Sequence, residues 1–297
     1  MFYRAILYWN YYKGGIPVQD QTKHDLLGIP LGIYTYCLTG TPTPFTHTIP
    51  GVDGIHEACF VEHDGLFAVV SAIFLKDFSE DTLEKNMTDV AWLAPLAKRH
   101  EEVIEFVMTH NPADRSGITP VVPLRFCTIY KNQEALFQAV IPHREKILHF
   151  LEYTSNKAEW AVKIFCDKKT FMDSHDKKIS GDTGEPASLL PGENYLLAKK
   201  MRRIREETFT VDIQRILNDI HSAVSPHVDS HRFLRCTDKS IHGRPFDMVM
   251  NTAFLVEQQT LPVFQVFVDT LAEKYKAHGF VFELTGPWPP YNFCLEL

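Results

Sequence analysis

The stretch Phe280–Phe293, FVFELTGPWPPYNF, joins an alternating apolar run to a segment rich in proline. The alternation in FVFELT predicts a β-strand. Pro287, Pro289 and Pro290 lack a backbone N–H, so this part of the chain cannot lie in the middle of a sheet. We therefore expect the strand to stop at the prolines, and the following YNFCLEL to add an edge segment to the same sheet.

Working backward from this strand, the second half of the chain shows one clear order of elements. The alternating or β-branched runs EWAVKIFC, HRFLRC and FDMVMNTAFLV predict strands. Two patterns with helical spacing, at 197–224 and 264–275, separate them. The resulting order, β-α-β-β-α-β, is that of a ferredoxin-like fold. We therefore predict a ferredoxin-like domain over 156–297, with an added C-terminal edge segment and a polar insert at 167–191.

The first half predicts a separate α+β domain over 31–155, preceded by an extension at 1–30. Asp64-Gly65 lies between two apolar runs and predicts a β-hairpin. A helical pattern of apolar residues includes His100, and a second one over 132–153 is interrupted by Pro142. Between these helices, TPVVPLRFCTIY is interpreted as one strand. The fold class is therefore α+β, in two domains.

Composition excludes several classes of function. The chain of 297 residues is 45% apolar and 23% charged, with a net charge of −7. Such an acidic balance argues against a nucleic-acid or anionic membrane surface. No apolar run approaches the roughly 20 residues that span a bilayer, and no signal pattern is visible, so we expect a cytoplasmic protein. Six cysteines without a C-x-x-C pair indicate reduced thiols in the core.

Catalytic and metal-binding patterns are weak. His227 and His231 have a ligand-like spacing, but they precede a strand, so turn and strand-edge histidines are the better interpretation and no metal is predicted. His100 is interpreted as a hydrogen-bonded core histidine. Arg125, inside an apolar strand, would need a carboxylate or carbonyl partner, which favours structural pairing over anion binding. Because no nucleophile with its base is apparent, we expect neither an enzyme nor a cofactor.

Several stretches together resemble one known family. LFAVVSAI, DVAWLAPLAKRHEEVIEFV, VVPLRFCTIY, EWAVKIF, PGENYLLAKK and TGPWPPYNF occur in the order found in the gas vesicle proteins of the GvpL/GvpF family. The most specific is G-P-W-P-P-Y-x-F, and the match runs from Gly32 to Phe293. One departure is Cys127, where the family pattern has glycine after P-L-R-F.

The resemblance implies a non-enzymatic accessory protein of gas vesicle assembly. It would contact the apolar major shell protein, with the gas-facing surface as one place of contact, and other gas vesicle accessory proteins. We expect three aromatics of the terminal motif to pack back between the two domains; the alternative is an exposed patch for a partner. A second function left open is a ferredoxin-like ligand-binding or enzymatic protein with an interdomain pocket near Arg125 and His100; a third is a metal-sensing module at the two histidines. The motif residues, structural or partner-binding, are Pro123, Leu124, Arg125, Phe126, Gly286, Pro287, Trp288, Pro289, Pro290, Tyr291 and Phe293.

Overall fold

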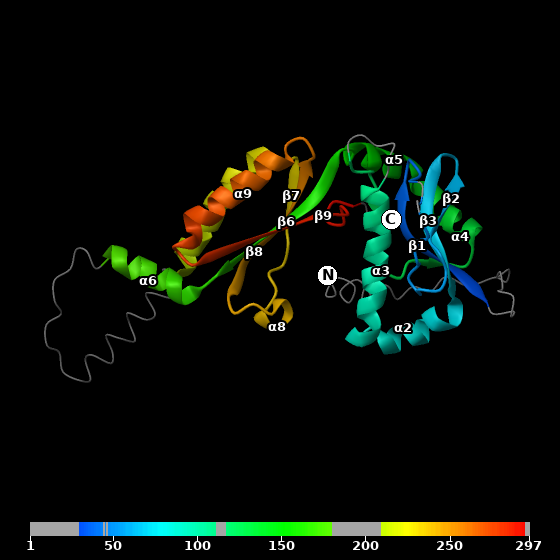
Figure 1. Ribbon diagram of the computed structural model, residues 1–297, viewed down its shortest axis with the longest axis horizontal. Helices are drawn as coiled ribbons and strands as arrows, with labels where there is room; N and C mark the ends of the chain where they lie inside the picture. The colour runs from blue at the N-terminus through cyan, green and yellow to red at the C-terminus, as the bar shows by residue number, and fades with distance from the viewer. Residues whose placement is uncertain (1–29, 44, 46, 111–116, 180–208, 295–297) are drawn as a thin grey trace. The chain divides into compact units, whose positions relative to one another are not determined.

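The computed structural model describes residues 30–43, 45, 47–110, 117–179 and 209–294. Three predicted segments therefore lie wholly or mainly outside the described residues: the extension at 1–30, most of the insert at 167–191, and the first part of the helix predicted at 197–224. The chain forms two compact units (Figure 1). The first comprises Met1–Ala158 and Trp288–Leu297, and the second comprises Glu159–Pro287.

The first unit is built on a five-stranded antiparallel sheet of order β2-β3-β1-β4, with β5 also pairing with β1. The predicted hairpin is confirmed, because Asp64 and Gly65 join β2 to β3 with φ of 49° and 74°. In β1, Tyr36 is an extra residue between Thr35 and Cys37, and this bulge re-aims its side chain. The strands are β1 (Leu31–Thr39), β2 (Cys59–His63), β3 (Leu66–Phe74), β4 (Val122–Pro123) and β5 (Ile129–Tyr130).

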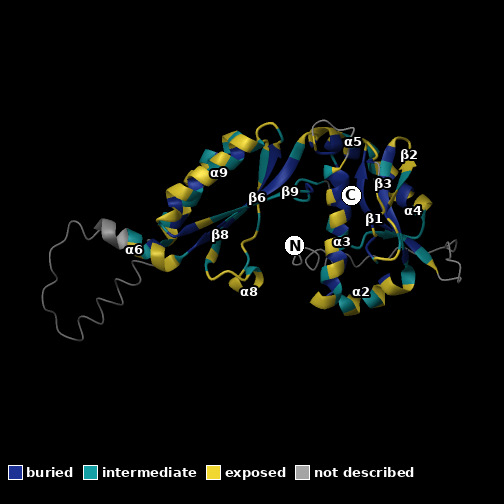
Figure 2. Ribbon diagram, in the orientation of Figure 1, coloured by how far each residue is buried: buried dark blue, intermediate teal, exposed yellow. Residues whose placement is uncertain are grey.

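Helices complete the first unit, and Figure 2 shows buried residues where they meet the sheet. The predicted break at Pro142 is confirmed, since a 3-10 turn separates α4 from α5. An apolar cluster joins β1, β3 and β4 to these two helices, with Leu38, Leu136 and Ile147 fully buried. The helices are η1 (Leu75–Phe78), α2 (Glu80–Asn86), α3 (Val90–Thr109), α4 (Gln133–Val140), η2 (Ile141–His143) and α5 (Arg144–Tyr153).

The second unit has a four-stranded sheet of order β7-β8-β6-β9. Helix α9 packs on this sheet, with the ring centroids of Phe264 and Phe254 5.9 Å apart. Its elements are β6 (Lys157–Cys166), α6 (Lys168–Ile179), a helical stretch at 209–224, η3 (Ser225–His227), β7 (Ser230–Phe233), α8 (Lys239–His242), β8 (Asp247–Glu257), α9 (Leu261–Lys276) and β9 (Phe280–Trp288).

The end of the chain differs from the expectation. Strand β9 continues through Pro287 to Trp288. It can do so because β9 is an edge strand, where a missing N–H breaks no ladder bond. Residues 291–293 form a turn and not an added edge strand. The residues from Trp288 onward group with the first unit, and the first division falls after Ala158. The predicted domain bounds of 31–155 and 156–297 stay a prediction.

The cysteines are all free, as predicted, although not all are core residues. Cys37 and Cys166 are buried, whereas Cys59 and Cys236 are exposed.

Candidate functional site

His100 lies in the middle of α3, on the face that packs against the first sheet. Asp89 caps this helix by accepting a hydrogen bond from the N–H of Ala91 at 2.9 Å, and Pro95 lies within it. The imidazole is 2% exposed. Burial lowers the pKa of His100 to about 3, and a backbone hydrogen bond at Leu124 opposes this shift. His100 is therefore a neutral core side chain, as its position on the apolar helix face predicted.

Tyr34 forms a hydrogen bond with one ring nitrogen of His100. The N–H of Cys127 donates to the Tyr34 hydroxyl at 3.0 Å. The same hydroxyl lies 2.9 Å from Nδ1 of His100. Since the peptide N–H can only donate, the hydroxyl accepts from Cys127, and the direction of its bond with Nδ1 depends on the tautomer of His100.

Tyr291 continues the network on the other side of the ring. Its hydroxyl lies 3.3 Å from Nε2 of His100 and is hydrogen-bonded to Glu101. An ionised carboxylate only accepts, so Tyr291 donates to Glu101 and accepts from Nε2–H. Burial, followed by the charge of Glu101, raises the pKa of Tyr291 well above its ordinary value. The His100 network thus links Cys127, Tyr34, His100, Tyr291 and Glu101 by hydrogen bonds, and His100 has a further bond to the backbone of Leu124.

The two sequence motifs meet at this network. The ring of Phe126 lies edge-on to that of His100, with centroids 5.7 Å apart. The thiol of Cys294 donates weakly to the carbonyl of Pro123 at 3.7 Å. Phe293 and Cys294 also pack against the apolar cluster of the first unit. The structure therefore brings the P-L-R-F motif and the part of the terminal motif from Trp288 onward together within the first unit.

The position of Arg125 differs from the expectation of a buried strand residue. Arg125 is exposed and begins a turn between β4 and β5. Its carbonyl accepts from the N–H of Thr128 at 3.1 Å and from the hydroxyl of Thr128 at 2.7 Å. Because the chain turns at Phe126 and Cys127, the guanidinium escapes burial. Cys127, third in the turn, has a φ of 63°, the left-handed conformation that a type II turn requires and that glycine adopts best.

Gly286 is held closely by the second unit. It has a φ of 148°, and a Cβ there would lie 2.8 Å from the ring of Trp160 and 2.9 Å from the carbonyl of Glu159. The Gly286–Pro287 peptide bond is cis. The motif therefore needs glycine at this position for steric reasons. The role of the half-buried Trp288, whether structural or partner-binding, stays a prediction.

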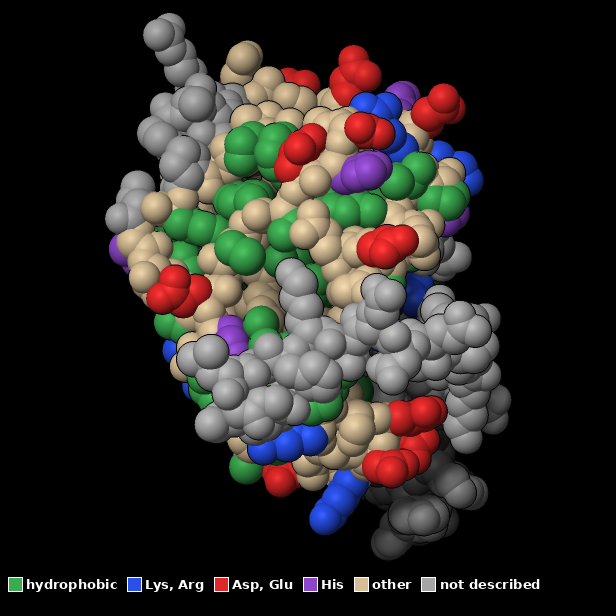
Figure 3. All heavy atoms as spheres, turned by 90° about the vertical axis from the view of Figure 1, so that its right-hand side faces the viewer, with side chains coloured by type: hydrophobic (Ala, Val, Ile, Leu, Met, Phe, Trp, Pro, Cys, Tyr) green, Lys and Arg blue, Asp and Glu red, His purple; other side chains and the backbone are tan. Residues whose placement is uncertain are grey.

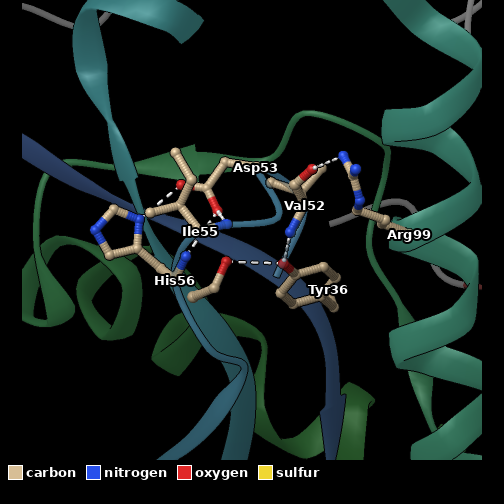
Figure 4. Close-up of polar contacts among 7 residues, drawn as sticks. Tyr36, Val52, Asp53, Ile55, His56 and Arg99 are labelled. Carbon is tan, nitrogen blue, oxygen red and sulfur yellow. Dashed lines mark hydrogen bonds and ion pairs between the residues drawn. The ribbon is translucent and has the colours of Figure 1, made fainter. Parts of the chain in front are cut away.

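Tyr36 and the loop between β1 and β2 that holds it were not apparent from the sequence (Figure 4). The Tyr36 hydroxyl accepts from the N–H of Val52 at 2.6 Å and forms a hydrogen bond with Ser71 Oγ at 2.8 Å. The guanidinium of Arg99 donates to the carbonyl of Val52 at 3.3 Å. Because the Tyr36 ring also stacks on His100, with centroids 5.7 Å apart, this loop supports the His100 network.

An Asx turn gives the same loop its shape. Asp53 accepts from the N–H groups of Ile55 and His56 at 2.9 and 3.0 Å. Its second oxygen lies 2.6 Å from Nδ1 of His56. A Cβ at Gly51 would lie 2.6 Å from Ser71 Oγ, so the loop approaches the sheet closely. The signal in the sequence is Asp53-Gly54, a turn-forming dipeptide at the end of a stretch rich in proline and threonine.

The two histidines with ligand-like spacing have different neighbours. His231 faces His221, with ring centroids 4.3 Å apart, whereas His227 packs against Phe267 at 4.6 Å. Within the described ranges, no group of three or more His, Cys, Asp or Glu side chains could hold a metal ion. In the same part of the chain, no helix is both long and apolar enough to cross a membrane.

Comparison with known proteins decides the family. A family model described as gas vesicle synthesis protein GvpL/GvpF matches residues 32–295. The chain belongs to the GvpL/GvpF family. Among its relatives, gas vesicle protein L of a Streptomyces species is 26% identical over 264 residues, which cover 88% of this chain and 92% of that protein. Gas vesicle protein F2 of Halobacterium salinarum is 24% identical over 262 residues, which cover 88% and 91%.

Solved structures of GvpF proteins share the fold. The crystal structure of GvpF from Anabaena sp. PCC7120 matches with a TM-score of 0.65 at 20% identity, covering 90% of this chain and 97% of that one. GvpF from Microcystis aeruginosa matches with a TM-score of 0.60 at 20% identity, covering 89% and 99%. This GvpL/GvpF chain is therefore a mixed α+β protein with two antiparallel sheets, and the resemblance of its motifs to the family is confirmed.

Proposed function

We propose that this GvpL/GvpF chain is a non-enzymatic accessory protein of gas vesicle assembly. It contacts the apolar major shell protein at the gas-facing surface and works with other gas vesicle accessory proteins. The observation that carries this proposal is the family match over residues 32–295. A shell subunit with an apolar face aggregates unless a partner covers that face during assembly, and this gives such a protein its role.

The chemistry of the His100 network supports a structural role. A neutral imidazole that is 2% exposed, with a hydrogen bond at each ring nitrogen, is not accessible as a base or a metal ligand. Arg125 lies on an exposed turn. The alternative of a ligand-binding or enzymatic pocket near these two residues therefore has no observation in its favour.

We also propose that Glu159–Pro287 is a ferredoxin-like domain and that the chain has two domains. The support is the order of elements β6, helix, β7, β8, α9 and β9, together with the strand order β7-β8-β6-β9. This strand order places the first and third strands of the unit side by side at the centre, as the split βαβ arrangement requires.

The test is co-expression of this chain with the major gas vesicle shell protein, followed by affinity capture. Wild type is compared with Trp288→Ala and with the matched Trp288→Phe, and the thermal melt of each variant is measured first. We expect wild type to capture the shell protein. If Trp288 is structural, Trp288→Ala melts at a lower temperature and Trp288→Phe restores both melting and capture.

Failure of wild type to capture the shell protein would overturn direct shell contact. Loss of capture by Trp288→Ala with an unchanged melt would show that the terminal motif is the docking surface, and the structural role of Trp288 would be wrong.

A further inference from the structure

A groove lies between the edge strand β2 and helix α4 of the first unit. Its volume is about 330 Å³. The ring of His63 stacks on Phe137 with centroids 5.1 Å apart, and Ile141 is 41% exposed at one end. Among the residues that the structure describes, β2 pairs with β3 on one side. On its other side, Ile49 and Pro50 pair with Ala58 and Glu57 just before β2, and Phe45 stacks on Phe60, so the open part of this edge is its end at Glu62. We call this feature the β2–α4 groove; it is lined by His63, Gln133, Glu134, Phe137, Gln138 and Ile141.

The hairpin shows which backbone groups of β2 face its open edge. Asp64 and Gly65 both have positive φ, so they form a two-residue type I′ turn. The flanking pair, which contains His63, exchanges hydrogen bonds between the strands. Because hydrogen-bonded and non-hydrogen-bonded pairs alternate, Phe60 and Glu62 point their N–H and C=O groups away from β3. The groups of Glu62 can accept a further strand.

Charge and side-chain type indicate what the groove would bind. Figure 3 shows the side of the molecule that carries β2 and α4 in Figure 1, where hydrophobic side chains gather among acidic, basic and histidine side chains. Glu134 and His63 are the ionisable residues in the groove lining. The exposed Glu62 and Asp64 lie on the hairpin, where Arg144 donates to the carbonyl of Asp64 at 3.0 Å. A second copy of this chain would bring two acidic edges together, which is unfavourable. A segment with a basic residue would complement them.

We propose that the β2–α4 groove binds an extended segment of another gas vesicle protein by strand addition. The backbone of that segment pairs with Glu62. Alternate apolar side chains enter the hollow over Phe137 and Ile141, and a Lys or Arg meets Glu134. This identification of the partner rests on the proposed function, whereas the groove and the open edge are features of the fold.

Glu62 offers a matched pair of variants. Glu62→Pro removes an N–H that faces the open edge and leaves the β2–β3 ladder intact, and edge strands tolerate such a proline. Glu62→Gln keeps this N–H and a side-chain oxygen for the N–H of Gly65, which Glu62 accepts at 2.7 Å. The probes are fluorescein-labelled, overlapping short peptides that span the major shell protein and the other gas vesicle proteins. Binding to the full chain is followed by fluorescence anisotropy.

We expect at least one basic, alternately apolar peptide to bind wild type and Glu62→Gln, and to bind Glu62→Pro about tenfold more weakly or worse. Ile141→Glu is a second test that does not depend on the proline variant folding. It weakens binding if apolar side chains enter the groove. It strengthens binding if basic peptides are held by charge alone, which would overturn the proposal.

Equal binding to wild type and Glu62→Pro, or no binding by any peptide, would also overturn it. A dimer in sedimentation experiments that Glu62→Pro dissociates would show that a second copy occupies the edge, and the assigned partner would be wrong. If Glu62→Pro captures the shell protein as well as wild type does, the groove is not the binding site, and the proposed role in assembly stands. Absence of capture by wild type would refute the proposed function itself.

Discussion

Replacing Cys127 by glycine should leave the protein more stable than replacing it by alanine. Cys127 is the third residue of the turn that Arg125 begins, with a φ of 63°. Its N–H donates to Tyr34 at 3.0 Å, so the turn also positions the His100 network. Both substitutions remove the same thiol, and the loss of its burial cancels in the comparison. The two variants then differ only by one Cβ.

The expected difference follows from two opposing terms. A residue with a Cβ in the left-handed region costs about 1–2 kcal/mol relative to glycine. Glycine loses about 0.4–1 kcal/mol through the greater entropy of the unfolded chain. The Cys127→Gly variant should therefore be more stable than Cys127→Ala by about 0–1.6 kcal/mol, with about 0.8 kcal/mol at the centre of the range, the opposite of the order at an ordinary helix or strand position.

Urea denaturation, with a thermal melt followed by circular dichroism, measures this difference. A chain of this size should show a melting temperature about 2 °C higher for Cys127→Gly than for Cys127→Ala. Ala139→Gly on the exposed face of α4 is the control, and there glycine should be less stable than alanine by about 1 kcal/mol. If Cys127→Ala equals or exceeds Cys127→Gly in stability, the left-handed turn and the reasoning from it are wrong.

Three other predictions concern the His100 network and Gly286. Tyr291→Phe removes the hydroxyl shared by the Nε2–H of His100 and the carboxylate of Glu101. It should lower the free energy of unfolding, measured by urea denaturation, by about 1–3 kcal/mol. An unchanged urea midpoint would contradict the network. Burial lowers the pKa of His100 to about 3 in the folded protein, whereas a histidine in the unfolded chain has a pKa of about 6.5. Below pH 6.5 the unfolded chain therefore binds a proton that the folded protein does not, and the stabilisation by neutral His100 falls as the pH is lowered toward about 3. The urea midpoint of wild type should thus fall more between pH 7 and pH 4.5 than that of His100→Gln, and parallel pH profiles would refute this. Gly286→Ala should lower the free energy of unfolding by more than about 2 kcal/mol, since the added Cβ would meet an indole ring at 2.8 Å. Gly65→Ala, where φ is positive but the space is open, should lower it only by the backbone strain of about 1–2 kcal/mol. Equal losses of stability in the two variants would argue against the close contact at Gly286.

Local patterns in the sequence were enough to predict features that depend on neighbouring residues. Asp64-Gly65 predicted the hairpin because both positions need positive φ, and Pro142 predicted the break between α4 and α5. The apolar face of α3 predicted that His100 is buried. The strands of the second half and helix α9 also followed, because periodicity is a property of each segment alone. The terminal motif, with its stiff backbone, indicated the family.

Tertiary structure alone decided where the motifs go. Arg125 looked buried in a strand, but a turn places it on the surface, because Cys127 adopts a conformation that its side chain disfavours. The proline in β9 is tolerated because the strand lies at the edge of its sheet, a fact of strand order that no local pattern contains. Tyr291 meets His100 across 191 positions of sequence. Such contacts depend on which surfaces pack together, and the chemistry of one segment does not specify its distant partner.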